Sequence, residues 1–66
     1  MSLNALLTET LKTSKLSEVI QTLCDIADTH ADLCMGDKST RTIGRCYQVV
    51  AMELEQAAMT AASKRL

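Results

Sequence analysis

The chain has no tryptophan, no phenylalanine and no proline, and only two of its 66 residues are glycine. Tyr47 is its single aromatic residue of the Phe, Trp and Tyr group. All-β folds need aromatic, β-branched and turn-forming residues, so their scarcity argues against one. The hydrophobic fraction of 47% and the net charge of −1 argue against disorder. So short a chain hardly builds both a core and a shaped pocket, so we expect a protein that is not an enzyme.

Neither sign of charge dominates, because eight acidic residues face seven Lys and Arg. Nucleic-acid binders usually carry a basic surplus, so we expect no nucleic-acid partner for a single copy. No apolar run approaches the ~20 residues of a membrane span, and the first residues lack the basic segment of a signal peptide. We therefore expect a cytoplasmic protein without a membrane partner.

Apolar residues recur at helical spacing in three segments, which predicts an all-α fold. The chain is long enough for one small domain, 1–66, with helices at about 2–13, 15–35 and 40–64. The short link between the second and third helices predicts an antiparallel helical hairpin, with the short N-terminal helix packed across it.

Residues that favour helix ends lie at the borders of these segments. Ser2 is placed to cap the first helix, Ser14 the second, and Ser39 or Thr40 the third. Gly36 suits the left-handed residue that follows a helix C-terminus.

Segment 15–35 carries the strongest pattern in the chain. With Leu16 at heptad position a, positions a, d and e form one broad face that is apolar apart from a histidine: Leu16, Leu23, His30, Val19, Ile26, Leu33, Ile20, Ala27 and Cys34. The matching stripe of the third helix is Ile43, Tyr47, Val50, Leu54, Ala57 and Ala61, with Ala58 beside it. We expect Leu3, Leu6 and Leu7 to fill the space left at its alanine-rich end.

The small size of the chain creates a stability problem. Ordering each residue costs roughly 1.5 kcal/mol, and burial in so small a core roughly cancels that cost. The three cysteines are an odd number without paired spacing, so they are expected to be free thiols. Oligomerisation is the remaining source of stability, and we predict a homodimer that forms a helical bundle.

A second apolar strip runs along the third helix, about 140° from the main stripe. Met52, Met59 and Leu66 are seven residues apart, Val49 lies beside them, and Arg45 lies at the N-terminal rim. Flexible methionine side chains on a face expected to be solvated indicate a partner surface. We therefore predict a small regulatory protein that acts through protein–protein contacts and needs no cofactor.

Two other interpretations remain open. Arg41 and Arg45 of two copies, side by side, would suit a dimeric DNA-binding transcriptional regulator. His30 and Cys34 lie one helical turn apart and could bind a metal ion with Cys46, although no fourth ligand is apparent. Cys24, expected at the exposed edge of the stripe, would be the thiol of a redox sensor.

Three stretches of the chain resemble the small helical proteins encoded between exo and xis in lambdoid phages. They are Met1-Ser2-Leu3-Asn4-Ala5-Leu6-Leu7, the run Leu23-Cys24-Asp25-Ile26-Ala27-Asp28-Thr29-His30-Ala31-Asp32, and Ala51-Met52-Glu53-Leu54-Glu55. The resemblance implies an early bacteriophage protein in the host cytoplasm that shifts infection or prophage induction toward lytic growth. Its partner would then be a host or phage protein, and the resemblance carries over no catalytic residue.

Overall fold

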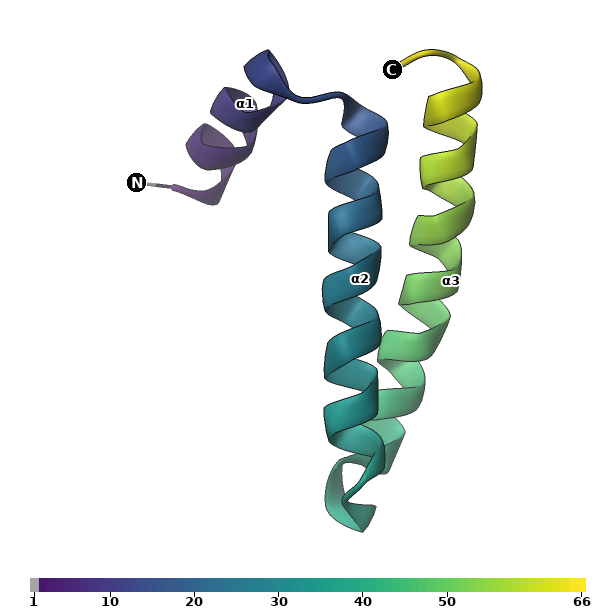
Figure 1. The fold of residues 1–66 in the computed structure, drawn as a ribbon. Helices are drawn as coiled ribbons and strands as arrows, with labels where there is room; N and C mark the ends of the chain where they lie inside the picture. Colours follow the sequence, from purple (N-terminus) through teal and green to yellow (C-terminus); the bar gives the residue numbers. More distant parts are fainter. Residues whose placement is uncertain (1) are drawn as a thin grey trace.

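The computed structural model describes residues 2–66 and shows an all-α protein with three main helices (Figure 1). They are α1 (Leu3–Thr13), α2 (Leu16–Met35) and α3 (Arg41–Ser63), and a short 3₁₀ turn, η1 (Lys38–Thr40), precedes α3. The prediction of an all-α fold is confirmed, and these bounds compare with the expected 2–13, 15–35 and 40–64. Met1, where the predicted domain begins, lies outside the described residues.

The first helix begins and ends for local reasons that the sequence predicted only in part. The Ser2 hydroxyl accepts a hydrogen bond from the Ala5 amide at 3.1 Å and so caps α1. The predicted cap of α2 is wrong, because Lys15 takes the capping position and makes no side-chain hydrogen bond. Ser14 instead ends α1, where its amide donates to the Thr10 carbonyl.

The link between α2 and α3 is built differently from the prediction. Gly36 has φ −74°, so it is right-handed and not the left-handed residue expected. The turn is held instead by Asp37, whose carboxylate accepts the Ser39 amide at 3.0 Å. Thr40 directly precedes α3, but its hydroxyl donates to the Cys34 carbonyl at 2.8 Å and does not cap the helix. These bonds tie the end of α2 to the start of α3.

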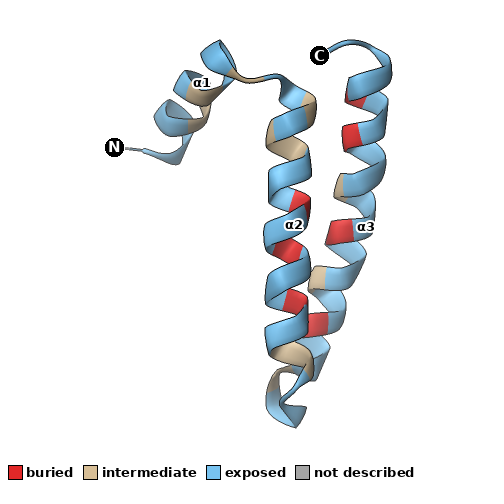
Figure 2. Ribbon diagram, in the orientation of Figure 1, coloured by how far each residue is buried: buried red, intermediate tan, exposed pale blue. Residues whose placement is uncertain are grey.

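Helices α2 and α3 run antiparallel and meet along a seam of small residues (Figure 2). The buried residues of this seam are Cys24, Ala27, Ala31, Gly44, Ala51, Ala58 and Ala61. A Cβ atom added at Gly44 would lie 3.1 Å from the Cβ of Cys34 and 3.1 Å from the Cγ and Sδ of Met35. The two backbones therefore approach closely where the side chains are smallest.

The large apolar residues do not form the hairpin core, which corrects the predicted stripes. Only part of the broad α2 face, represented by Ala27, turns toward α3, while Ile26 is 50% exposed. On α3 the predicted stripe is confirmed at Ala61 and at Ala58 beside it, but Ala51, at 2% exposed, is buried in place of Val50, which is 47% exposed. Tyr47 and Leu54 are partly buried against the seam. Small side chains lie at the contact between α2 and α3 because they permit the two helix axes to approach more closely.

The first helix packs only on α2, to the side of the hairpin, and contributes no buried residue (Figure 1). The expectation that it crosses both long helices and fills the alanine-rich end is wrong. Leu3 is 70% exposed and Leu6 is 51% exposed, and Leu7 alone of the three is partly buried. Ala58 and Ala61 are already buried in the seam, so no gap is left for these leucines.

The C-terminal turn of α3 fastens the hairpin at its open end. Arg65 adopts a left-handed conformation with φ 61°, and the Arg65 and Leu66 amides donate to Ala62 and Ala61, which is the Schellman pattern. The Leu66 carbonyl then accepts hydrogen bonds from the amide and the hydroxyl of Ser17, both at 3.2 Å. The start of α2 and the end of α3 are thereby joined.

Of the helices formed by residues 2–66, none combines the length and apolar character that a membrane crossing requires.

Candidate functional site

The strip predicted as a partner surface lies in solvent along α3. Met52 is 64% exposed, Met59 is 67% exposed and Val49 is 55% exposed. Leu66 is 51% exposed, and Arg45 is exposed as well. We call these five residues the outer strip. Met59 borders a shallow hollow whose α2 wall is polar and consists of Ser17, Glu18 and Gln21.

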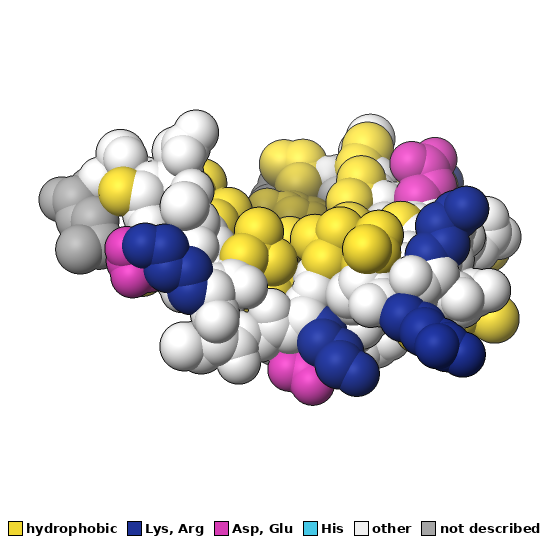
Figure 3. Space-filling model, turned by 90° about the horizontal axis from the view of Figure 1, so that it is seen from above, with side chains coloured by type: hydrophobic (Ala, Val, Ile, Leu, Met, Phe, Trp, Pro, Cys, Tyr) yellow, Lys and Arg dark blue, Asp and Glu magenta, His cyan; other side chains and the backbone are white. Residues whose placement is uncertain are grey.

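A second and larger apolar surface lies on the other side of the hairpin. We call it the open apolar face, and its most exposed large residues are Leu16, Leu23, Ile26, Leu33, Ile43 and Val50. Val50 and Met52 are two residues apart, about 200° around a helix, so the open apolar face and the outer strip point in opposite directions. Seen from above, hydrophobic side chains gather between α1 and the hairpin, with charged side chains toward the margins (Figure 3).

An aromatic stack bridges the two long helices on the open apolar face. The rings of His30 and Tyr47 are stacked, with centroids 5.4 Å apart and planes 21° from parallel. His30 was expected within the core of the stripe, but it is exposed, and Tyr47 is half-buried. The stack spans the seam where small side chains provide little contact area, and it leaves the imidazole in solvent.

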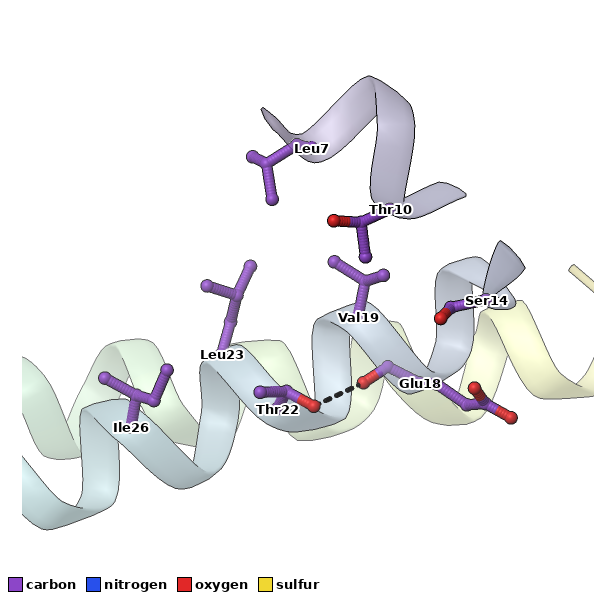
Figure 4. Close-up of a pocket in the computed structure, with 8 residues that line it drawn as sticks. All are labelled: Leu7, Thr10, Ser14, Glu18, Val19, Thr22, Leu23 and Ile26. Carbon is purple, nitrogen blue, oxygen red and sulfur yellow. Dashed lines mark hydrogen bonds between the residues drawn. The ribbon is translucent and has the colours of Figure 1, made fainter. Parts of the chain in front are cut away.

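A hollow of about 290 Å³ separates α1 from the first half of α2 (Figure 4). Leu7 and Thr10 of α1 point across it toward Val19 and Leu23 of α2, and Ile26 lies at its far end. Its walls are mostly aliphatic, so it is suited to an apolar side chain of another molecule. Glu18 is its one ionisable lining residue, and a single carboxylate provides no acid–base pair.

The three cysteines lie in different environments. Cys24 was expected at an exposed edge, but it is 3% exposed and its thiol donates to the Ala51 carbonyl at 3.2 Å. Burial raises the pKa of Cys24, and the nearby carboxylates of Asp28, Glu55 and Asp25 raise it further. The expectation that Cys24 is exposed is therefore wrong, and a buried thiol is poorly placed for redox sensing.

The predicted metal ligands do not come together in a cluster. Cys34 is half-buried and Cys46 is exposed, and His30 stacks on Tyr47. Among residues 2–66, no group of three or more His, Cys, Asp or Glu side chains is arranged to hold a metal ion. The helical spacing of His30 and Cys34 was the only signal for such a site.

Charged side chains are exposed along α2 and α3, and one of them, Glu18, lines the hollow beside Leu23 and Ile26 of the open apolar face. Asp25, Asp28 and Asp32 are exposed on α2, and Gln21 donates to Asp25 at 3.3 Å. Arg41 and Arg45 are exposed at the start of α3. Within the described residues the one ion pair joins Lys12 and Glu9 of α1 at 3.0 Å, so neither arginine is paired.

The open apolar face is the feature that the sequence analysis missed, although a signal for it was present. Small residues recur every seven positions in both long helices, as Ser17, Cys24 and Ala31 on α2 and as Gly44, Ala51 and Ala58 on α3. Two such heptad rows fit the close seam of an antiparallel helix pair and leave the adjacent row of large residues without a partner. No family model, no curated protein and no solved structure matches the chain, so the surfaces are interpreted from their chemistry alone.

Proposed function

We propose that this chain is a small, non-enzymatic interaction module that regulates another protein by binding it through the outer strip of α3. The observation that carries the proposal is the exposure of two methionines on the long helix α3, Met52 at 64% and Met59 at 67%. Methionine side chains adapt to the shape of a partner, and a rigid helix presents them at fixed spacing.

The surroundings of the outer strip support this function. Ala62 beside Met59 is small and exposed, so a partner helix is able to approach the backbone of α3 closely there. Arg45 at the N-terminal end offers a charged contact at the rim, where polar groups fix orientation. A regulator of lytic development, which the resemblance to the exo–xis proteins implies, would act on a host or phage protein in this way.

The test compares two double variants with the parent chain in affinity capture from a host lysate. Met52→Glu with Met59→Glu places two charges on the strip and is expected to lose the captured protein, while circular dichroism shows unchanged helix content. Met52→Leu with Met59→Leu keeps the apolar character and is expected to retain it. Capture of the same protein by the glutamate variant at parental yield would refute the proposal.

A second candidate function, DNA binding by a dimer, is favoured by one observation. Arg41 and Arg45 are exposed one helical turn apart at the start of α3, and neither is paired with a carboxylate. Filter-binding titration against salt separates the two functions, because phosphate contacts weaken steeply as salt rises and apolar contacts barely respond. Loss of DNA retention in Arg41→Gln with Arg45→Gln would support this candidate, and absence of retention by the parent would exclude it.

A further inference from the structure

The described chain is one layer of helices, which is an incomplete arrangement for a globular protein. The Cα atoms extend 40 × 31 × 12 Å, so the third dimension is less than half of either of the others. The radius of gyration is 13.7 Å, compared with about 11 Å for a compact domain of this length. Stable domains bury the apolar side of one layer against a second layer. This single layer therefore has an apolar side that lacks its cover.

The exposed area gives the size of the missing cover. The accessible surface is 5128 Å², whereas a compact monomer of 7.2 kDa exposes about 4,100 Å². The excess is about 1,000 Å² for each chain, which is close to the ~800 Å² that each partner buries in a standard stable interface. The open apolar face contributes to this excess with residues such as Leu33, which is 71% exposed, and Ile43, which is 52% exposed.

The chemistry of the open apolar face favours an identical partner. Its α2 rows, at heptad positions a and d, contain no charged residue, since the four acidic residues of α2 lie at positions c and f: Glu18, Asp25, Asp28 and Asp32. The a and d rows of α2 from two copies thus meet without repulsion between like charges. The 3-4 spacing of Leu16, Val19, Leu23 and Ile26 is that of knobs-into-holes packing in a four-helix bundle.

We infer that a second copy of this chain covers the open apolar face, in a two-fold symmetric dimer whose core is formed by α2 and α3 of both copies. The small-residue seam holds each hairpin together, and the large residues form the shared core between hairpins. The outer strip points away from this core, so the dimer presents two outer strips to other proteins. The inference concerns a different surface from the proposed function and stands independently of it.

Solution mass and thermal stability provide the first test, with the full chain and no other protein. Sedimentation equilibrium at tens of micromolar is expected to give twice the 7.2 kDa of one chain. The unfolding midpoint is expected to rise with chain concentration, because association stabilises only the folded form. A mass of one chain together with a midpoint that does not depend on concentration would overturn the inference, as would a mass of three or more chains.

Isotope-filtered NMR provides the second test and needs no variant that risks unfolding. In a mixture of labelled and unlabelled chains, intermolecular contacts are expected at the methyl groups of Ile26, Leu23 and Val50. Contacts confined to the methyl groups of Met52 and Met59 would overturn the inference and assign self-association to the outer strip. Intermolecular contacts at both the open apolar face and the outer strip would also overturn the two-fold dimer, because such contacts would require a larger assembly.

A pair of double variants completes the design. Ile26→Glu with Val50→Glu is expected to reduce the mass to one chain, whereas Met52→Glu with Met59→Glu is expected to leave it at two. Met52→Glu with Met59→Glu is also the double variant that is expected to lose partner capture under the proposed function. Failure of the dimer and failure of the partner surface therefore give different results in the same set of proteins.

Discussion

Val50 and Ala51 are adjacent residues of α3, but they lie on two differently packed surfaces of the helix. Ala51 lies in the seam and is 2% exposed, whereas the adjacent Val50 lies on the open apolar face and is 47% exposed. The fully buried residues of both long helices are small, whereas most of their large aliphatic residues are exposed. In most single domains the large aliphatic residues are the buried ones. The comparison indicates that small residues set the distance between α2 and α3, while the exposed large residues are the ones that the proposed dimer would bury.

The energetic consequence follows from the area that each kind of side chain buries. Burial stabilises by roughly 25 cal/mol for each Å² of apolar surface, so an alanine seam contributes far less than a leucine or isoleucine core. The seam gains instead from closely spaced backbones and from polar ties at both ends, such as Thr40 to Cys34 and Ser17 to Leu66. A hairpin of this kind has defined geometry but little stability of its own, which agrees with the need for association inferred from its exposed area.

Enlarging a seam residue tests this comparison with the largest expected effect. Ala51→Leu should destabilise the protein by about 3 kcal/mol, because the added atoms must separate α2 from α3 along the tightest part of the seam. Urea denaturation followed by circular dichroism measures the change.

The matched control introduces the same side chain elsewhere on α3. Gln56 is exposed, so Gln56→Leu is expected to change the free energy of unfolding by less than about 0.5 kcal/mol. Equal destabilisation by the two leucines would show that the seam is no tighter than the surface, and the contrast between the two regions would be lost.

The sequence predicted the helices well because their signals are local. The bounds were predicted from three segments with helical periodicity, from a serine before the first segment and from a short polar link before the third. The structure nearly matches these bounds. The link itself was mispredicted at Gly36, since Asp37 caps a 3₁₀ turn and removes the need for a left-handed residue. Local pattern thus located the helices but not the details of their connection.

Which side of each helix faces the other could not be read from hydrophobicity. A broad apolar face contains two candidate seams, one through Leu23 and Ile26 and one through Cys24 and Ala27. Choosing between them requires the contact distance between axes, which depends on residues of both helices at once. The outer strip was identified because it lies outside both candidate seams. The residues of the open apolar face were instead assigned to the core of the hairpin.

Alanine substitutions at the two glycines are expected to change the free energy of unfolding by intermediate amounts and in opposite directions. Gly44→Ala should destabilise by about 1 kcal/mol, because its Cβ would be 3.1 Å from the Cβ of Cys34, and this contact outweighs the gain in helix propensity. Gly36→Ala should stabilise by about 0.5 kcal/mol, since its φ is −74° and nothing lies within 4 Å of the added atom. Thermal unfolding measures both, and stabilisation by both alanines would show that the seam yields easily.

The cysteines distinguish buried from open positions without altering packing. Cys46 is exposed and Cys24 is buried, so iodoacetamide should modify Cys46 at least about tenfold faster at neutral pH. Mass spectrometry of peptides at timed intervals gives the order. Similar rates at both cysteines would mean that the seam opens freely.

The raised pKa of Cys24 also predicts a dependence of stability on pH. Burial and nearby carboxylates favour the protonated thiol in the folded chain, so the unfolded chain loses this proton at lower pH. This contribution to stability is complete at neutral pH and declines as pH rises past the ordinary thiol pKa of about 8.5. Cys24→Ala should flatten the alkaline decline and Cys46→Ala should not, as urea titrations from pH 7 to 10 would show. An unchanged decline in Cys24→Ala would assign it to other groups.

The smallest effect is expected at the C-terminal turn, where backbone conformation can be separated from charge. Arg65 has φ 61°, a conformation that costs a residue with a Cβ roughly 1–2 kcal/mol, part of which glycine recovers. Arg65→Gly should therefore stabilise by about 0.5 kcal/mol, while Arg65→Ala, which removes the charge but keeps the Cβ, should give no gain. If both variants stabilise equally, the charge of Arg65 is the cause and not its backbone. A gain confined to glycine would show that the left-handed backbone of residue 65, next to the Leu66 carbonyl that binds Ser17, is strained by a Cβ.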